Sequence, residues 1–350
     1  MRRYYTRACN FYYGKVSKLL LSKKKTFSLN GSKEISFSHI EIISRKSRKK
    51  IPINDINNLS KSLRRQILLD LRYITSKNKN FSNLNFKKLP NIMGVLNLTP
   101  DSFSDGGKFN KVNIGVKHAY EMIKAGANLI DVGGESTRPG SKTIKKKIEW
   151  NRISGVLKSI CKKITVSLDT RKSELMEKGI KLGVKIINDV SGLSYDKKTL
   201  DLLKKYEIPF VIQHAQGTPE NMQNKPRYKN ELLDIYDFFE EKIKTLRDFG
   251  ITHNNIIIDP GIGFGKNLKH NMNLISNISI FHSLGFPILV GNSRKRFIKE
   301  LVKKNDSDKR IGGTVASSIY LMMQGVQILR IHDVNELIQG IKVFKELINK

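Results

Sequence analysis

Eight short apolar runs are spaced along the chain from residue 91 onward, and a polar residue with useful chemistry follows each of them. Runs of this length between turn signals are typical of buried strands. The segments between them are long enough for a helix that crosses over to the next parallel strand. This alternation predicts an α/β fold, a (β/α)8 TIM barrel, in which reactive side chains lie at the carboxyl ends of the strands. The runs, each with its polar residues, are Ile92–Leu96 with Asn97, Leu129–Val132 with Gly133–Glu135, Ile164–Leu168 with Asp169, Val184–Ile187 with Asn188 and Asp189, Phe210–Ile212 with Gln213 and His214, Ile256–Ile258 with Asp259, Ile288–Val290 with Gly291–Lys295, and Val326–Leu329 with Arg330 and His332.

Two of the connecting segments show helical periodicity clearly. Apolar residues recur at intervals of three and four between 116 and 127, after the first run, and between 232 and 249, after the fifth. Gly250 follows the second pattern, at a position where glycine commonly ends a helix. We therefore expect crossover helices in both segments.

The first 90 residues differ in kind from the rest. They hold 22 Lys and Arg against 4 Asp and Glu, and so carry most of the net charge of +33. Residues 26–53 alternate in a strand-like way around an Asn30-Gly31 turn, a good hairpin signal, and residues 56–74 have helical spacing. We expect residues 1–89 to form a small basic β/α appendage and residues 90–350 to form the barrel.

The charge and the cysteines leave several interpretations open. A strongly basic appendage is typical of nucleic-acid or anionic-membrane binding, but a genome biased toward Lys, Asn and Ile codons produces the same composition. Residues 1–30 are basic and contain no acid, like a mitochondrial presequence. Cys9 and Cys161 form no CxxC pair, which favours a reducing compartment. We expect a cytoplasmic protein, with a mitochondrial one as the alternative, and neither nucleic-acid nor membrane binding.

Three loops after predicted strands carry candidate chemistry. Residues 97–107, rich in Ser, Asp, Gly and Pro, have the composition of a mobile lid. Residues 133–141 form a second polar loop around Arg138. The sequence Asp-Pro-Gly-Ile-Gly-Phe-Gly-Lys at 259–266 has the glycine spacing of neither a phosphate-binding Walker loop nor a dinucleotide-binding loop. Its glycines are expected to let the backbone pass close under a flat ligand.

Seven motifs in order along residues 91–345 resemble those of the dihydropteroate synthase family of pterin-binding barrels. The motifs are Asn-Leu-Thr-Pro-Asp-Ser-Phe-Ser-Asp-Gly-Gly, Gly-Gly-Glu-Ser-Thr-Arg-Pro-Gly, Leu-Asp-Thr, Ile-Asn-Asp-Val, Asp-Pro-Gly-Ile-Gly-Phe-Gly-Lys, Gly-Asn-Ser-Arg-Lys and Arg-Ile-His-Asp-Val. The resemblance implies a transferase of folate biosynthesis. Such an enzyme joins 4-aminobenzoate to 6-hydroxymethyl-7,8-dihydropterin diphosphate and releases diphosphate and 7,8-dihydropteroate, and sulfonamides compete with 4-aminobenzoate.

The resemblance also implies a role for each matching residue. The pterin, with its several N–H donors, would bind to Asp169, Asn188 and Asp259, beside Phe264 and Lys295. The diphosphate would bind to Arg330 and His332, with Mg²⁺ held by Asn97, an oxygen ligand of the kind this cation prefers. Thr137, Arg138 and Ser293 would bind 4-aminobenzoate. Asp105, on the lid with Phe103, would stabilise the cationic methylene that forms as diphosphate departs. The residues assigned to catalysis are Asp105, Arg138 and Lys295.

The resemblance has departures and a near alternative. Gln213 and Ala215 flank His214 where the family often has Met, Asn292 stands where Met is common, and Arg296 adds a charge beside Lys295. A pterin-dependent methyltransferase shares the barrel, but it needs neither the two substrate-closing loops nor a diphosphate clamp. Because family members commonly pair through their outer helices, we expect a homodimer that binds small-molecule substrates.

Overall fold

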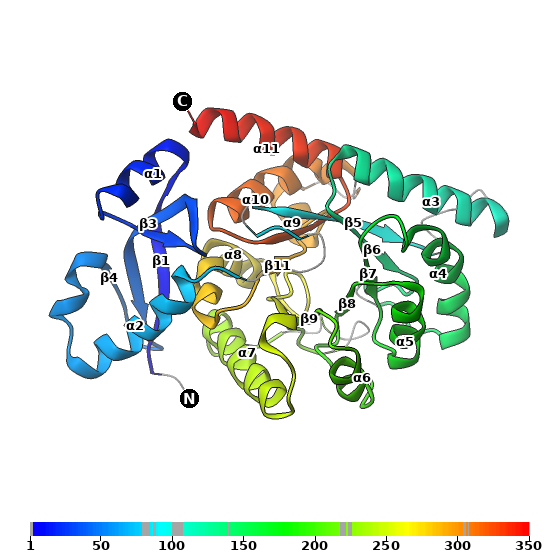
Figure 1. Cartoon of the computed structure of the whole chain (residues 1–350), viewed down its shortest axis with the longest axis horizontal. Coiled ribbons are helices and arrows are strands. Elements are labelled where there is room, and N and C mark those ends of the chain that lie inside the picture. Colours follow the sequence, from blue (N-terminus) through cyan, green and yellow to red (C-terminus); the bar gives the residue numbers. More distant parts are fainter. Residues whose placement is uncertain are drawn as a thin grey trace.

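Two separate sheets make up the strand framework of the chain (Figure 1). A computed structural model describes residues 3–78, 84–86, 89–99, 108–138, 140–217, 222, 226–303, 306 and 308–349, with the backbone alone for 108–111. The first sheet lies within residues 5–52, and the second begins at residue 91.

The second sheet is a closed barrel of eight parallel strands. Its order is β10-β9-β8-β7-β6-β5-β12-β11, and a bridge between Ile258 and Ile288 joins the two ends. All eight predicted strands are confirmed, within one or two residues at their ends. The strands are β5 (Asn91–Asn97), β6 (Leu129–Gly133), β7 (Val166–Asp169), β8 (Ile186–Asp189), β9 (Phe210–Gln213), β10 (Ile256–Asp259), β11 (Leu289–Val290) and β12 (Ile328–Ile331).

Helices surround the barrel and bury its outer surface in one large apolar core. The two predicted crossover helices are confirmed as α3 and α7, and Gly250 follows α7 with a φ of 95°. The helices are α3 (Lys108–Ala125), α4 (Lys146–Ile160), α5 (Ser173–Leu182), α6 (Thr199–Tyr206), α7 (Glu231–Asp248), α8 (Leu268–Ser276), α9 (Arg296–Val302), α10 (Ile311–Met323) and α11 (Val334–Ile348), with short 3-10 helices η3 (His253–Asn255), η4 (Ile278–Leu284) and η5 (Asp308–Arg310).

The first sheet forms an appendage with its own apolar core. Antiparallel strands β1 and β2 flank β3, and β4 also pairs with β3. The predicted hairpin at Asn30-Gly31 is confirmed, and both residues have positive φ angles, of 52° and 66°. The predicted helix at 56–74 is a 3-10 turn followed by an α-helix, which packs Ile67, Leu71 and Ile74 against the sheet. The elements are β1 (Tyr5–Tyr13), α1 (Gly14–Ser22), β2 (Phe27–Leu29), β3 (Ser32–Ile43), β4 (Arg48–Pro52), η1 (Ile53–Asn58) and α2 (Lys61–Thr75).

The appendage lies against one side of the barrel, in blue in Figure 1. The side chains of Tyr5 and Ile43 belong to the large apolar core of the barrel rather than to the core of the appendage. The Tyr5 ring meets Tyr236 of α7 edge-on, with centroids 5.0 Å apart. Such a pair contributes about 0.5–1.5 kcal/mol beyond the area it buries. The hydroxyl of Tyr13 donates to the carbonyl of Met323 at 2.9 Å, so the contact is polar as well as apolar.

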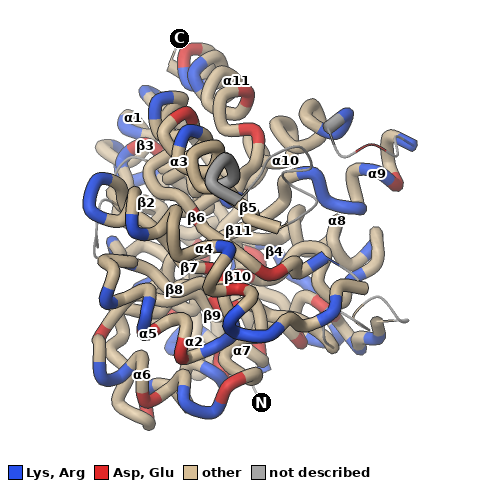
Figure 2. Tube along the Cα trace, turned by 90° about the vertical axis from the view of Figure 1, so that its right-hand side faces the viewer, with Lys and Arg blue, Asp and Glu red and all other residues tan. Residues whose placement is uncertain are grey.

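The positive charge is spread over both parts of the chain. Figure 2 shows Lys and Arg on the appendage and on the barrel helices alike. Cys9 and Cys161 are both buried and free. Among the described residues, every helix is too short or too polar to cross a membrane.

Candidate functional site

The alternation of side chains along the barrel strands decides which residues face the interior. One residue from each of seven strands meets in an apolar cluster near the amino-terminal end, together with Leu84 and Phe86. Side chains two or four positions further along each strand face the same interior at the carboxyl end. With one residue from β7, this upper layer consists of Asn97, Gly133, Asp169, Asn188, Gln213, Asp259, Gly291 and Arg330. The structure thus brings together five residues that the sequence analysis assigned to the site.

Arg330 ties this layer together through two buried carboxylates. Its Nε donates to Asp131 Oδ2 at 2.6 Å, and its Nη2 donates to Asp169 Oδ2 at 2.8 Å. Burial raises the pKa of the Asp169 carboxyl, and the charge of Arg330 opposes that rise. A residue expected to bind the pterin is therefore paired with one expected to bind the diphosphate.

Asp131 is a member of the site that the sequence analysis missed. It is fully buried, and it accepts a hydrogen bond from Asn188 Nδ2 at 3.0 Å in addition to the one from Arg330. Its signal was an acidic residue inside the apolar run Leu129–Val132, since charged residues are almost never fully buried unless they are paired.

Two groups on β8 and β9 have unused hydrogen-bonding capacity in the same layer. Asn188 Oδ1 and Gln213 Nε2 are buried, and neither finds a hydrogen-bond partner among the described residues. Gln213 is 3% exposed and pairs in register with Asp259 of β10. One free acceptor and one free donor thus lie beside a buried carboxylate. Such groups are costly to bury unless a ligand or water completes their hydrogen bonds.

Asp259 is oriented by the glycine-rich loop that follows it. Its Oδ1 accepts from the backbone N–H of Gly261 at 2.8 Å, and burial raises its pKa to about 6. Gly261 has a φ of +69°, and an added Cβ there would lie 1.9 Å from the carbonyl oxygen of His214. Gly261 thus makes room for the backbone after β9, whereas Gly263 of the same loop lines the cavity, and the expectation that these glycines let the backbone pass under a flat ligand stays a prediction.

Lys295 extends from the segment after β11 toward the ring of Phe264. Its Nζ lies 4.2 Å from the ring centroid, a cation–π distance. Burial, with the nearby charge of Arg330, lowers the pKa of Lys295 to about 8. The ammonium group of Lys295 is therefore largely protonated at pH 7 and can donate hydrogen bonds. It loses its proton as the pH rises above about 8.

His332 and Ser293 form a second pair at the rim. The Oγ of Ser293 lies 3.0 Å from His332 Nδ1 and accepts from the backbone N–H of His332 at 3.2 Å. Burial, helped by Arg330, lowers the pKa of His332 to about 3. His332 therefore meets a ligand at neutral pH as a neutral imidazole rather than as a cation.

Glu135, which comes just before Thr137 and Arg138 in the same loop, belongs to a buried network of ion pairs. Glu135 accepts from Arg171 Nη2 at 2.7 Å and from Lys172 Nζ at 3.0 Å. Lys172 also bonds to Glu149, which accepts from Thr170 Oγ1 at 2.6 Å. This network could not be read from the sequence, because its members come from three separate elements.

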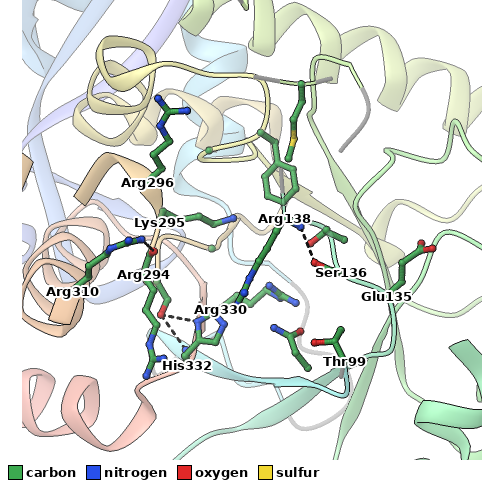
Figure 3. Close-up of a pocket in the computed structure, with 17 residues that line it drawn as sticks. Thr99, Glu135, Ser136, Arg138, Arg294, Lys295, Arg296, Arg310, Arg330 and His332 are labelled. Carbon is green, nitrogen blue, oxygen red and sulfur yellow. Dashed lines mark hydrogen bonds between the residues drawn. The ribbon is translucent and has the colours of Figure 1, made fainter. Parts of the chain in front are cut away.

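A cavity of about 550 Å³ lies at the carboxyl end of the barrel (Figure 3), lined by Asn97 and Arg330 of the strand-end layer and by the loops that carry Arg138, Phe264 and Lys295. Lys295 and His332 lie on one side and Thr99 and Ser136 on the other. The cations that line the cavity outnumber its single acidic residue, Glu135, and they are Arg138, Arg294, Lys295, Arg296, Arg310 and Arg330. Arg294 and Arg296 are neutralised by Asp333 and Glu300. Arg330 is likewise paired, with Asp131 and Asp169. Arg138 and Lys295 have no such carboxylate partner among the described residues, and they suit an anionic ligand.

Some of the other predicted residues line the cavity and some do not. Thr137, Arg138, Phe264 and Ser293 all line the cavity. Phe103 and Asp105 lie outside the described residues. His214 is not among the residues that line the cavity, and its Nδ1 lies 3.0 Å from the Nζ of Lys266.

Asn97 could supply one of the several oxygen ligands that a magnesium ion needs. Its side-chain amide lines the cavity and makes no hydrogen bond to a described residue. The described residues contain no group of three His, Cys, Asp or Glu arranged to hold a metal. Mg²⁺ is often held by one or two protein oxygens and completed by water and substrate phosphates, which is the arrangement a single amide oxygen allows.

Known proteins resemble this chain in both sequence and structure. The family described as "Pterin binding enzyme" matches residues 93–332. The dihydropteroate synthase of Escherichia coli K12 is 41% identical over 256 residues, which cover 73% of this chain and 90% of that protein. The solved Yersinia pestis dihydropteroate synthase, in complex with a sulfonamide drug, superposes with a TM-score of 0.71 at 38% identity and covers 75% of this chain and 96% of its own.

A further solved structure holds a pterin product. The Xanthomonas albilineans dihydropteroate synthase in complex with 7,8-dihydropteroate has a TM-score of 0.68 and 32% identity, and it covers 75% of this chain and 95% of its own. The family match spans well over half of the chain, and the relatives are covered nearly from end to end. The chain therefore belongs to the pterin-binding enzymes and, among them, to the dihydropteroate synthases.

Proposed function

We propose that the site joins 4-aminobenzoate to 6-hydroxymethyl-7,8-dihydropterin diphosphate. The amine nitrogen forms a bond to the methylene carbon of the pterin, the bond from that carbon to the diphosphate oxygen breaks, and the amine gives up a proton. The observation that carries the proposal is the arrangement at the carboxyl end of the barrel, where a floor of buried carboxylates and amides at the strand ends adjoins the cavity through Arg330, and the lining of the cavity itself forms a rim rich in cations. A neutral heterocycle with many N–H groups suits the floor, and a diphosphate suits the rim.

In this proposal the pterin ring binds to the floor of the barrel. Asp259, Asn188 and Asp169 accept its N–H groups, and the free Oδ1 of Asn188 supports that assignment. Lys295 donates to an acceptor on the ring, with Phe264 beside it. Asp131 acts through Arg330 and Asn188, since it hydrogen bonds to both, and is a positioning residue.

The leaving group binds at the rim. Arg330 supplies the charge, and neutral His332 with Ser293 supplies hydrogen bonds. Asn97 would hold Mg²⁺, which neutralises charge on the departing diphosphate when it is bound. A cation rim of this kind stabilises the transition state because negative charge grows on the leaving oxygen.

The second substrate binds between the two polar loops. Arg138 and Thr137 receive the carboxylate of 4-aminobenzoate, with Ser293 nearby, and the exposed Arg138 guanidinium supports this. Asp105, on the first loop, stabilises the cationic methylene. Binding of the pterin diphosphate below completes this pocket.

We further propose the setting in which the enzyme works. Residues 1–89 act as an appendage to a catalytic barrel of residues 90–350. The protein is cytoplasmic, which its two free cysteines support. It is a homodimer through the outer helices, where the apolar side chains of Tyr320, Val343 and Leu347 are 45%, 62% and 68% exposed.

Inhibition by a sulfonamide tests this assignment. Sulfonamides mimic 4-aminobenzoate, so a sulfonamide is expected to raise the apparent KM for 4-aminobenzoate without lowering kcat. Its binding should also require the pterin diphosphate or free diphosphate with a pterin. A sulfonamide that competes with the pterin diphosphate instead would contradict the proposed division of the cavity.

A further inference from the structure

Arg45 of the appendage forms two ion pairs with the first turns of α7. It lies in the turn between β3 and β4, and its Nη1 and Nη2 donate to Asp234 Oδ1 and Asp237 Oδ2, both at 2.7 Å. The Tyr5 hydroxyl donates to the other oxygen of Asp237 at 2.6 Å. The three charged side chains are between 23% and 29% exposed, so water screens the pairs only in part. A planar guanidinium held by two carboxylates has little freedom to rotate.

Asp234 passes this constraint to the start of the helix. Its second oxygen, Oδ2, accepts from the backbone N–H groups of Lys229 at 2.9 Å and Asn230 at 3.1 Å. The Asn230 side chain in turn caps the helix by accepting from Leu233 at 3.2 Å. With Asp234 held by Arg45, the chain entering α7 has a fixed path.

That entering segment contacts the loops of the site. The hydroxyl of Tyr228 donates to the carbonyl of Gly265 at 2.8 Å. The side chain of Gln216 bonds in both directions to the backbone of Arg227, at 2.9 and 3.0 Å. Gly265 has a φ of +63°, and an added Cβ would lie 2.5 Å from Gln216 O, so the two loops interlock closely. The other end of the glycine loop is Gly261, whose N–H orients Asp259.

We propose that Arg45 is a positioning residue of the synthase, which holds the glycine-rich loop and so the Asp259 carboxylate in place for the pterin diphosphate. The inference rests on the proposed function, since it assigns Asp259 to that substrate. The contacts run from Arg45 through Asp234 and the start of α7 to Tyr228 and Gly265. The appendage is therefore part of the working enzyme and not a separate module.

The test compares full-length variants under steady-state conditions. Arg45→Ala and Tyr228→Phe should each raise the KM for the pterin diphosphate by about threefold. This is the factor expected when the free energy of a partly exposed ion pair or of one hydrogen bond is lost. The KM for 4-aminobenzoate should stay at the wild-type value. Because both variants break one chain of contacts, the double variant should raise KM by less than the product of the two.

Arg7→Ala is the matched control. Arg7 pairs with Glu41 at 2.8 Å within the appendage, and its loss should leave both KM values unchanged. Hydrogen exchange gives a readout independent of activity, with faster exchange of the amides at 227–230 and 261–265 in Arg45→Ala and at 261–265 in Tyr228→Phe.

Two results would overturn the proposal. One is wild-type KM and wild-type exchange in Arg45→Ala, and the other is equal effects of Arg45→Ala and Arg7→Ala. If Arg45→Ala does not fold, Tyr228→Phe must still show the KM change and faster exchange at 261–265, or the proposal fails. A wild-type protein that forms no dihydropteroate would refute the proposed function instead, while the exchange comparison would still decide whether Arg45 holds the loop.

Discussion

Replacing Asp259 by Asn separates the binding role of this carboxylate from its cost to the fold. The side chain is 4% exposed and accepts one hydrogen bond at 2.8 Å from the N–H of Gly261. The amide oxygen of Asn can keep that bond while its NH2 group takes the place of the second carboxylate oxygen. What is lost is the negative charge and an acceptor that would meet an N–H of the pterin.

The loss can be translated into affinity. A charge-assisted hydrogen bond in a closed site contributes about 1.5–3 kcal/mol. The dissociation constant for the pterin diphosphate should therefore rise by roughly 10- to 150-fold in Asp259→Asn.

The effect on folding has the opposite sign. Burial raises the pKa of Asp259 from 3.8 to about 6, so the ionised carboxyl is less favourable in the folded protein than in the unfolded chain. The folded protein is therefore destabilised as pH rises from about 4 to about 6, by about 3 kcal/mol for a shift of this size. Asn cannot ionise and escapes that loss. Relative to the wild type, Asp259→Asn should gain about 3 kcal/mol between pH 4 and pH 7.

Isothermal titration calorimetry checks the affinity, and urea denaturation checks the stability. Titration with the pterin diphosphate gives the dissociation constant, and urea denaturation of both proteins at pH 4 and pH 7 gives the difference in free energy of unfolding. Wild-type affinity in the variant would refute the assignment of Asp259 to the pterin. A stability difference that does not change with pH would refute the inferred pKa.

Four other outcomes follow from the site. Arg138→Ala should raise the KM for 4-aminobenzoate and leave pterin diphosphate affinity unchanged, and the reverse pattern in the same assays would show that the loop is misassigned. Gln213→Leu should weaken pterin diphosphate binding about fivefold, since a buried amide donor with no partner among the described residues is removed; equal affinity by calorimetry would exclude that donor as a ligand. The value of kcat/KM for the pterin diphosphate should rise with pH through about 6, as Asp259 ionises, and fall above about 8, as Lys295 loses its proton. A profile that is flat from pH 5 to 9 would contradict both roles. Deletion of residues 1–88 should lower the free energy of unfolding in urea, because Tyr5 fills part of the barrel's core, and unchanged stability would show that the contact contributes nothing.

The sequence predicted the layer of site residues because of a general property of parallel barrels. Strands end at one face, so polar residues after apolar runs meet there. That property placed Asp259 and Arg330 near each other although 70 residues separate them in the chain. It could not predict that Arg330 bonds to Asp131 and Asp169, since this depends on which side chains reach one another across the interior.

Contacts between elements distant in sequence were also beyond prediction. The strand Tyr5–Tyr13 was not predicted, and its first residues pack against both the appendage and the barrel, which removes the clean alternation of a strand with one wet face. Arg45 looked like one of many basic residues, and only its distances to Asp234 and Asp237 distinguish it. The pairing of Glu135 with Lys172 is likewise visible only in three dimensions.

The most direct test of the proposed reaction is to follow both products after the full-length protein is mixed with both substrates. We expect 7,8-dihydropteroate, detected by mass spectrometry, and diphosphate, detected enzymatically, to form in equal amounts. Neither should form when one substrate is left out, and Lys295→Ala should greatly slow both. Diphosphate released at the same rate without 4-aminobenzoate, or no dihydropteroate at all, would contradict the assignment of this barrel as a synthase.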